Sequence, residues 1–542
     1  MRKPIFRLIA ICLAVCVLFS GCGVIDLMGY FERLGAMMGL SSISFENMEY
    51  ERPDVDYIED VLDNCMELSK DQNADIDELG NLIYEFFSLY TGFCTNYYLS
   101  YIHYCINMSD TYWETEYNFC ASKIATVDGG RDKLLYALAD SPHRSKLESD
   151  DYFGEGYFDA FDGESTWTDA FTALMEQETA LQNEYYRISS EATAVEYYSE
   201  AYFEQYGTQL ADLYVKMIKL RQQIAQEAGF TDYPSFAYDF YHHRDYSVED
   251  TTTYLAQIQL ELSPLYRNLT TSGFWNQYFS SSSTAQTYGY VEQMAAAMGG
   301  TVEDAFNLMD DAGLHHIEYG ENKYAGSFEI YLLDYMEPFV FVSPTGTLDD
   351  KLTFAHEFGH FCNDYASDGT VAGIDVSEFF SQGMEYLSLC YVNNTTELEK
   401  LKMADSLCVY VEQAAYASFE HQVYGLTGDD LTAENVRSLY EQAGKAFGLD
   451  SMGIWDSRDY VAIGHFFTSP LYIISYVVSN DAAMQLYQME RSEKGTGLSC
   501  YTANLATEEA YFLAFLETAG LESPFAAGRI ADVKKTFQDV LK

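Results

Sequence analysis

The sequence is poor in basic residues for its length. Lysine and arginine together number 30 in 542 residues, against 84 aspartates and glutamates, so the formal net charge is −54 at pH 7. No stretch resembles a basic patch, and proteins that bind nucleic acid depend on such patches to neutralise phosphates. We therefore do not expect nucleic acid as a partner. The acidity favours solubility and substrates that are neutral or basic.

Long apolar runs are also scarce. One of them, Leu8 to Phe19, follows three basic residues and is too short for an ordinary membrane-spanning helix. It ends in the segment LFSGC at Cys22, which resembles a bacterial lipoprotein signal. We expect a signal peptide over residues 1–21, a lipidated Cys22 that anchors the protein outside the cytoplasm to the bacterial cell membrane, and a tether over residues 22–44. A simple secretory peptide and an uncleaved anchor are the alternatives.

Proline and closely spaced cysteines are rare as well. The chain has 9 prolines and 11 cysteines, and no C-x-x-C occurs. Helical periodicity runs over residues 55–127 and 167–229, whereas 128–163 reads as loops with at most a hairpin. Residues 327–334 and 338–343 read as two strands. The pattern predicts a mainly α fold with a small β-sheet, divided into an N-terminal helical lobe (45–230) and a second lobe (231–542).

Histidine is scarce too, which makes one motif informative. Among only 10 histidines, a chance H-E-x-x-H has odds on the order of one in a hundred. The motif lies at His356, Glu357 and His360, in a helix that we expect to begin with Thr347 as N-cap and Asp350 as its acidic partner. On a helix the two histidines share one face and can bind one metal ion, while Glu357, about 100° away, can reach a water at that metal.

A third metal ligand is expected downstream of the motif. Glu378 is the best candidate, and Glu385 lies seven residues further on, so that both share a face of a second helix. One can bind the metal while the other supports the first ligands. Two histidines, one carboxylate and an open position are typical of catalytic zinc. The alternative is a histidine pair whose hydrogen bonds are satisfied inside a core.

A second cluster lies near the C-terminus. His465 precedes Tyr472 and Tyr476, which are four residues apart, so their hydroxyls can point in one direction. Beside an H-E-x-x-H motif these three residues are candidates for stabilising charge.

Four segments together resemble a known family. They are GTLDD (346–350), HEFGH (356–360), DVSE (375–378) and GHFF (464–467). The chain resembles the thimet oligopeptidase and oligoendopeptidase F family of zinc metallopeptidases, closer to oligoendopeptidase F. The resemblance implies a mostly helical, two-lobed body around a deep channel that admits short peptides.

The resemblance also implies roles for the candidate residues. One zinc ion per chain is expected on His356, His360 and Glu378, with Glu357 as general base in the hydrolysis of internal peptide bonds. The substrate-binding and oxyanion-stabilising positions of the family match His465, Tyr472 and Tyr476. The alternative function is a catalytically inactive, lipid-anchored protein that binds peptides with the same fold. The sequence does not predict the oligomeric state.

Overall fold

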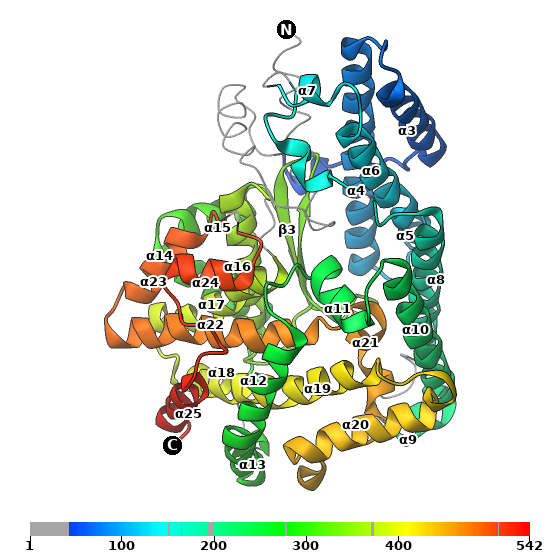
Figure 1. Cartoon of the computed structure of the whole chain (residues 1–542). Helices are drawn as coiled ribbons and strands as arrows, with labels where there is room; N and C mark the ends of the chain where they lie inside the picture. Colours follow the sequence, from blue (N-terminus) through cyan, green and yellow to red (C-terminus); the bar gives the residue numbers. More distant parts are fainter. Residues whose placement is uncertain are drawn as a thin grey trace.

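The computed structural model describes residues 43–149, 152–163, 165–192, 199–276, 279–369, 373–507 and 509–542. The expected signal peptide, Cys22 and all but the last two residues of the expected tether lie outside these ranges. Helices surround one small sheet (Figure 1), so the predicted mainly α fold with a small sheet is confirmed. Within the described part of the chain, no helix is both long and apolar enough to cross a membrane.

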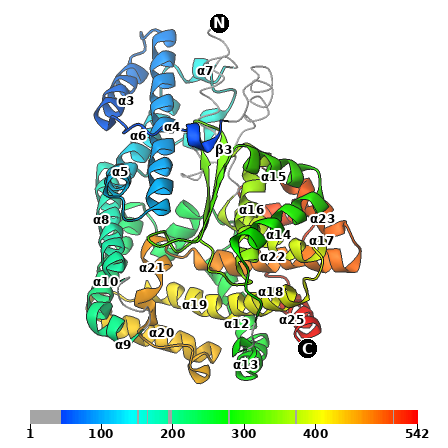
Figure 2. The same cartoon turned by 180° about the vertical axis from the view of Figure 1, so that it is seen from behind.

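The N-terminal helices form a column along one side of the molecule (Figures 1 and 2). Aspartates at 54, 75 and 110 cap three of them by accepting hydrogen bonds from backbone N–H groups. At the far end of α10, Gly229 adopts a φ of +84°, which ends the helix. The helices are α3 Val55–Lys70, α4 Ile76–Ile106, α5 Thr111–Ala121, α6 Ile124–Ala139, α7 Arg144–Leu147, α8 Asp169–Ala192, α9 Glu200–Tyr202 and α10 Thr208–Glu227.

The prediction of loops from residue 128 is wrong at its start. Helix α6 continues through Gly129 and Gly130 to Ala139. A Cβ at Gly129 would lie 2.8 Å from the Trp167 ring, and one at Gly130 would lie 2.7 Å from the Leu62 side chain. The two glycines therefore serve close packing inside a helix, although a glycine pair ordinarily indicates a turn.

A three-stranded sheet lies beside α16, the helix with the H-E-x-x-H motif (Figure 1). The strand order is β1-β3-β2, with β1 His315–Ile317 parallel to β3 Glu337–Val342 and β2 Phe328–Leu332 antiparallel to it. All six residues of β3 are buried. The two predicted strands are confirmed as β2 and β3. The sequence does not reveal β1, because three residues are too few for a periodicity.

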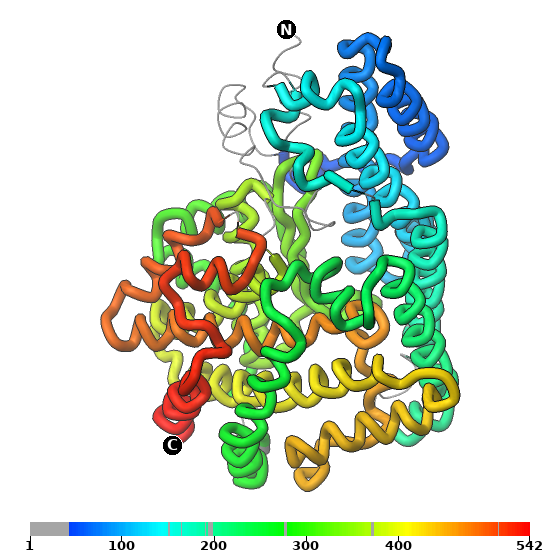
Figure 3. The backbone as a smooth tube through the Cα atoms, viewed as in Figure 1, coloured from blue at the N-terminus to red at the C-terminus, as the bar shows by residue number. Residues whose placement is uncertain are grey.

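The remaining helices build the rest of the body. Figure 3 traces the backbone to its C-terminal helix, α25, which packs on α12 and α18. The helices are α11 Tyr233–Phe236, α12 Val248–Glu261, α13 Ser263–Thr271, α14 Thr284–Met298, α15 Thr301–Asp311, α16 Asp350–Ser367, α17 Ile374–Tyr391, α18 Thr396–Cys408, α19 Ala414–Val423, α20 Ala433–Phe447, α21 Gly464–Thr468, α22 Ile473–Ser492, α23 Thr496–Asn504, α24 Phe512–Ala519 and α25 Arg529–Val540.

Buried apolar side chains fall into two clusters. The smaller cluster lies within residues 55–161, and the larger one contains the core around α16, α17 and α22. The predicted boundary between lobes at residue 230 stays a prediction.

One buried arginine joins helices α8 and α10 to the segment of His465. Arg221 of α10 is fully buried and pairs with Glu178 of α8, with 2.7 Å between Nε and Oε1. Its two terminal nitrogens donate to the main-chain carbonyls of Phe466 (2.6 Å) and Phe467 (2.5 Å). Arg221 therefore fixes the backbone that follows His465.

We predict that Arg221→Met lowers the free energy of unfolding by about 3–5 kcal/mol, because Glu178 would stay buried without its cation. Urea denaturation measures the change. The matched control is Arg187→Met on α8, since Arg187 and its partner Glu191 are 54% and 57% exposed. That variant should cost about 0–1 kcal/mol. Equal losses in the two variants would contradict the role of Arg221.

Candidate metal centre

Helix α16 begins at Asp350, two residues later than expected. Thr347 is not its N-cap, because Asp349 holds that position without a side-chain cap. The Asp350 carboxylate instead accepts hydrogen bonds from the backbone N–H groups of Thr345 and Gly346, both at 2.8 Å. The acidic residue thus fixes the turn before α16.

Helix α17 comes unusually close to α16 at the motif. A Cβ at Gly359 would lie 2.6 Å from Cα of Ser381 and 2.7 Å from the carbonyl oxygen of Phe380. Only glycine fits such an approach without displacing the partner backbone. The variable position before His360 therefore sets the distance between the two helices that carry the candidate ligands.

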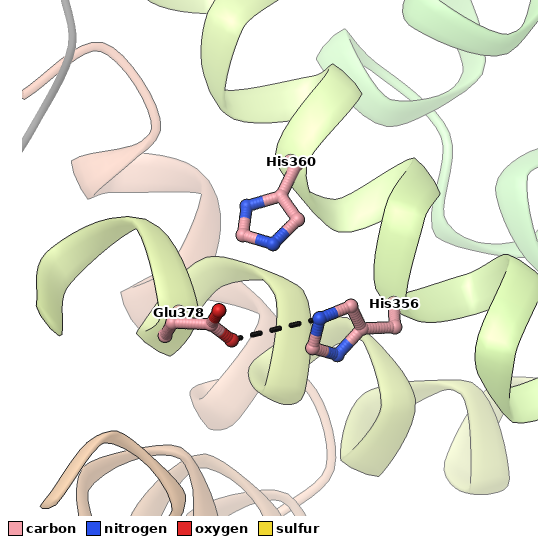
Figure 4. Close-up of side chains that lie close together, drawn as sticks. All are labelled: His356, His360 and Glu378. Carbon is pink, nitrogen blue, oxygen red and sulfur yellow. Dashed lines mark ion pairs between the residues drawn. The ribbon is translucent and has the colours of Figure 1, made fainter. Parts of the chain in front are cut away.

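His356, His360 and Glu378 point towards one another from these two helices (Figure 4). One potential ligand atom of each lies within 4.8 Å of the others, and Nε2 of His356 is 3.5 Å from Oε2 of Glu378. No other group of three or more histidine, cysteine or acidic residues in the described ranges has this geometry. The structure thus brings the three predicted ligands together.

Hydrogen bonds orient both imidazole rings. Nδ1 of His356 is 2.9 Å from Oε1 of Glu385, and Nδ1 of His360 is 2.9 Å from the Ser377 hydroxyl. Both Nε2 atoms are therefore left for the space between the three side chains. The sequence left open which of Glu378 and Glu385 binds the metal and which supports a ligand. Glu385 has the supporting role.

Lys402 of α18 is a participant that the sequence reasoning missed. It is only 2% exposed, and its ammonium donates to Oε2 of Glu385 at 2.7 Å. Burial alone would raise the pKa of Glu385, but Lys402 and His356 bring that pKa below its usual range. The available signal was weak: Lys402 falls on the apolar side of its helix, next to Met403, where a lysine is unusual.

The Glu378 carboxylate is held on both oxygens. The Tyr472 hydroxyl donates to Oε1 at 2.5 Å, and the Ser381 hydroxyl donates to Oε2 at 3.2 Å. Tyr472, expected to contact substrate, thus lies against a candidate ligand. Tyr472 precedes the first residue of α22, and the hydrogen bond ties that helix to α17.

Glu357 is buried beside the candidate ligands. Burial, together with the negative charges of Glu378 and Glu385, raises its pKa to about 7, whereas His356 opposes the shift. A carboxylate with a pKa near neutrality can both accept and release a proton. This property fits the role that the motif predicts for Glu357.

His465 and Tyr476 form a pair next to Tyr472. Nε2 of His465 on α21 lies 3.2 Å from the Tyr476 hydroxyl on α22. The rings of Tyr472 and Tyr476 have centroids 5.1 Å apart, and His465 is 5.7 Å from each. The structure therefore brings the three residues of the second predicted cluster into contact, and Tyr472 links them to Glu378.

Two stretches of the chain match known family models. Residues 45–168 match the peptidase M3 N-terminal domain, and residues 164–275 match a model described as angiotensin-converting enzyme. Both matches end before the H-E-x-x-H motif. No curated protein matches the chain.

Solved structures share the fold over nearly the whole chain. A chain assigned as oligoendopeptidase F aligns with a TM-score of 0.79 at 20% identity, covering 92% of this chain and 99% of its own. PZ peptidase A, solved with an inhibitor, has a TM-score of 0.77 at 18% identity, with 92% and 99% covered. A chain from Bacillus anthracis str. Ames, also assigned as oligoendopeptidase F, has a TM-score of 0.76 at 19% identity, with 93% and 98% covered.

These likenesses agree with the sequence motifs. The solved structures show that the fold extends through the candidate metal centre, and the N-terminal match independently indicates an M3 peptidase. Residues 45–168 therefore match the peptidase M3 family, and the chain shares the fold of the solved oligoendopeptidase F structures.

Proposed function

We propose that the protein is a zinc-dependent endopeptidase that hydrolyses internal bonds of short peptides. The observation that carries the proposal is the convergence of His356, His360 and Glu378 beside the buried Glu357. The family supports a metallopeptidase function in general. Zinc, endopeptidase action and short substrates are the proposed refinements.

The three side chains fit a catalytic zinc ion. Two imidazoles and one carboxylate are the ligand set of such sites, and the supporting hydrogen bonds leave the two Nε2 atoms available. A zinc ion held there would supply Lewis acidity to water and to the substrate carbonyl. We propose one ion per chain.

Glu357 moves the proton in the proposed reaction. Its carboxylate accepts a proton from the attacking water and passes it to the amine that leaves when the peptide bond breaks. The pKa of about 7 suits both transfers, since neither protonation state is strongly favoured near neutral pH.

Tyr476 and His465 are the proposed donors to the carbonyl oxygen of the substrate. Tyr472 is already bound to Glu378, so we assign it chiefly to orienting that ligand. The Tyr476 hydroxyl lies 3.2 Å from Nε2 of His465, and no carboxylate of the described residues is hydrogen-bonded to it. Donors placed for a developing negative charge are typically worth about 10²–10³ in turnover.

The location of the protein is a separate proposal from the sequence alone. The segment that ends at Cys22 supports lipid attachment on the outer side of the cell membrane. Short peptides outside the cytoplasm would then be the substrates.

We predict that Glu357→Gln lowers turnover of a mixed peptide library by about 10²–10⁴-fold, because the amide cannot accept the proton of water. Zinc content by metal analysis should stay at one per chain. Glu303→Gln, at an exposed position on α15, is the matched control and should keep full activity. Undiminished turnover by the Glu357 variant would refute the assignment.

Zinc removal should also separate an enzyme from a passive peptide-binding protein. Treatment with a chelator should abolish cleavage of a quenched peptide, and added zinc should restore it. His360→Asn should lose stoichiometric zinc, because a three-ligand site loses one ligand. His316→Asn on β1 should retain zinc, since His316 lies outside the converging group. Peptide binding without cleavage in the zinc-loaded native protein would favour the inactive alternative.

Lys402→Met should weaken zinc binding by about 10–100-fold, the usual effect of losing support for a ligand. Without the ammonium, Glu385 would be buried beside the metal centre without its cation and would hold His356 less firmly. Competition against a chelator of known affinity measures the change. Lys400→Met, an exposed lysine on the same helix, is the control and should leave affinity unchanged. Equal affinities in both variants would remove Lys402 from the metal centre.

A further inference from the structure

The turn that joins α21 to α22 has an unusual backbone. It covers residues 469–472, and Leu471 within it adopts a φ of +61°. A bulky residue in this left-handed region is an outlier, because its Cβ comes too close to the following carbonyl oxygen. The Leu471 side chain is also buried. Such a conformation persists only where the surrounding structure enforces it, and it occurs most often at functional sites.

The turn lies between the residues of the second predicted cluster. His465 is on α21 before it, Tyr472 is its last residue, and Tyr476 lies one helical turn further along α22. The Tyr472 hydroxyl donates to Glu378, and the Tyr476 hydroxyl lies 3.2 Å from Nε2 of His465. The conformation of the turn therefore determines how α22 begins, and with it where both hydroxyls point.

A buried carboxylate holds Leu471 in this conformation. Glu420 lies on α19, which packs against α22 (Figure 1). Its Oε1 accepts a hydrogen bond from the Leu471 N–H at 2.7 Å, the only hydrogen bond of this carboxylate within the described part of the chain. Burial raises the pKa of Glu420 to about 8, and the Leu471 N–H, Arg221 and Arg244 oppose the shift. Burying a carboxylate is costly, and the contact with Leu471 is what this one provides.

A neutral histidine holds the residue before Leu471. Nε2 of His242, between α11 and α12, donates to the carbonyl of Pro470 at 2.9 Å. Because a carbonyl only accepts, this nitrogen carries the ring proton. Burial, together with the charge of Arg244, lowers the pKa of His242 well below its usual range, so the ring is neutral. Side chains from two separate elements thus hold two consecutive residues of the turn.

The backbone on either side of the turn is fixed as well. Arg221 holds the residues that follow His465, as described above, and Arg244 donates to the Ser475 hydroxyl in the first turn of α22 at 2.8 Å. The proline before Leu471 has a φ that its own ring restricts. The conformational freedom that remains between α21 and α22 is therefore concentrated at Leu471, where Glu420 makes its contact.

We propose that Glu420 and His242 are positioning residues for the peptidase reaction. They hold the turn in the left-handed conformation that places the hydroxyls of Tyr472 and Tyr476. This inference rests on the proposed function and adds to it the residues that set the geometry of the oxyanion donor. A misplacement of about 1 Å in such a group can lower the rate about 10²-fold. The effect is therefore expected on turnover more than on peptide binding.

A double-mutant cycle tests the proposal with a quenched peptide and saturating zinc. Glu420→Met removes the acceptor and should lower kcat by about 10–10²-fold with little change in KM. Tyr476→Phe alone should lower kcat by about 10²–10³-fold. In the Tyr476→Phe background, Glu420→Met should have a much smaller effect, because the hydroxyl that it positions is already absent. An equal loss of kcat in the two backgrounds would overturn the positioning role.

Two further variants separate positioning from folding. Glu420→Gln keeps an oxygen that can accept from the Leu471 N–H and should retain kcat. The matched control is Glu490→Met near the end of α22, since Glu490 is also buried and its Oε1 accepts from the Gly495 N–H at 2.7 Å. It should lower the urea midpoint and leave kcat unchanged. A loss of kcat in Glu490→Met as large as that in Glu420→Met would overturn the proposal, because any destabilisation would then have the same effect.

The same cycle can be run with a second positioning residue. If Glu420→Met does not fold, His242→Leu removes the contact with Pro470 and should also lower kcat only where the Tyr476 hydroxyl is present. Additive losses in that cycle, in an enzyme that cleaves peptides, would overturn the positioning role alone. Absence of cleavage by the native protein would overturn it together with the proposed function, and full kcat in Tyr476→Phe would overturn it together with the assignment of Tyr476.

Discussion

The contact between α16 and α17 at Gly359 is the constraint on which the metal centre depends. The H-E-x-x-H motif can align two histidines on its own helix, but the third ligand must come from another element. The backbone of α17 lies where a side chain at position 359 would be. Glu378 can therefore reach the space beneath His356 and His360, and Glu385, seven residues along, can reach Nδ1 of His356.

Charge is distributed around this contact in a consistent way. Three glutamates and two histidines are buried or half-buried within the same region, and an uncompensated carboxylate there would be costly. The Lys402 ammonium balances the negative charge of Glu385 through its Oε2. The Tyr472 hydroxyl donates a hydrogen bond to one oxygen of Glu378. Glu357 keeps a raised pKa because it is buried, and the like charges of Glu378 and Glu385 add to the shift. The supporting residues thus hold the candidate metal ligands in place, while the pKa of Glu357, the proposed proton-transfer group, stays raised.

Much of the site could be predicted because helical spacing converts sequence into geometry. The i, i+4 relation of His356 and His360 and the seven-residue step from Glu378 to Glu385 both determine a shared face. Lys402 could not be found in this way, since its contact joins two different helices. The same limit applies to β1, whose partner β3 lies more than twenty residues away, and to Gly129 in α6, whose neighbour Trp167 decides its conformation.

The loop that carries Tyr324 joins two parts of the molecule mechanically. It leaves β1, which pairs with β3 beside α16, and it is also hydrogen-bonded to the last turn of α4. A tilt of α4 would therefore pull on the loop that follows β1. The orientation of the N-terminal helical column and the position of this loop are therefore coupled through the backbone.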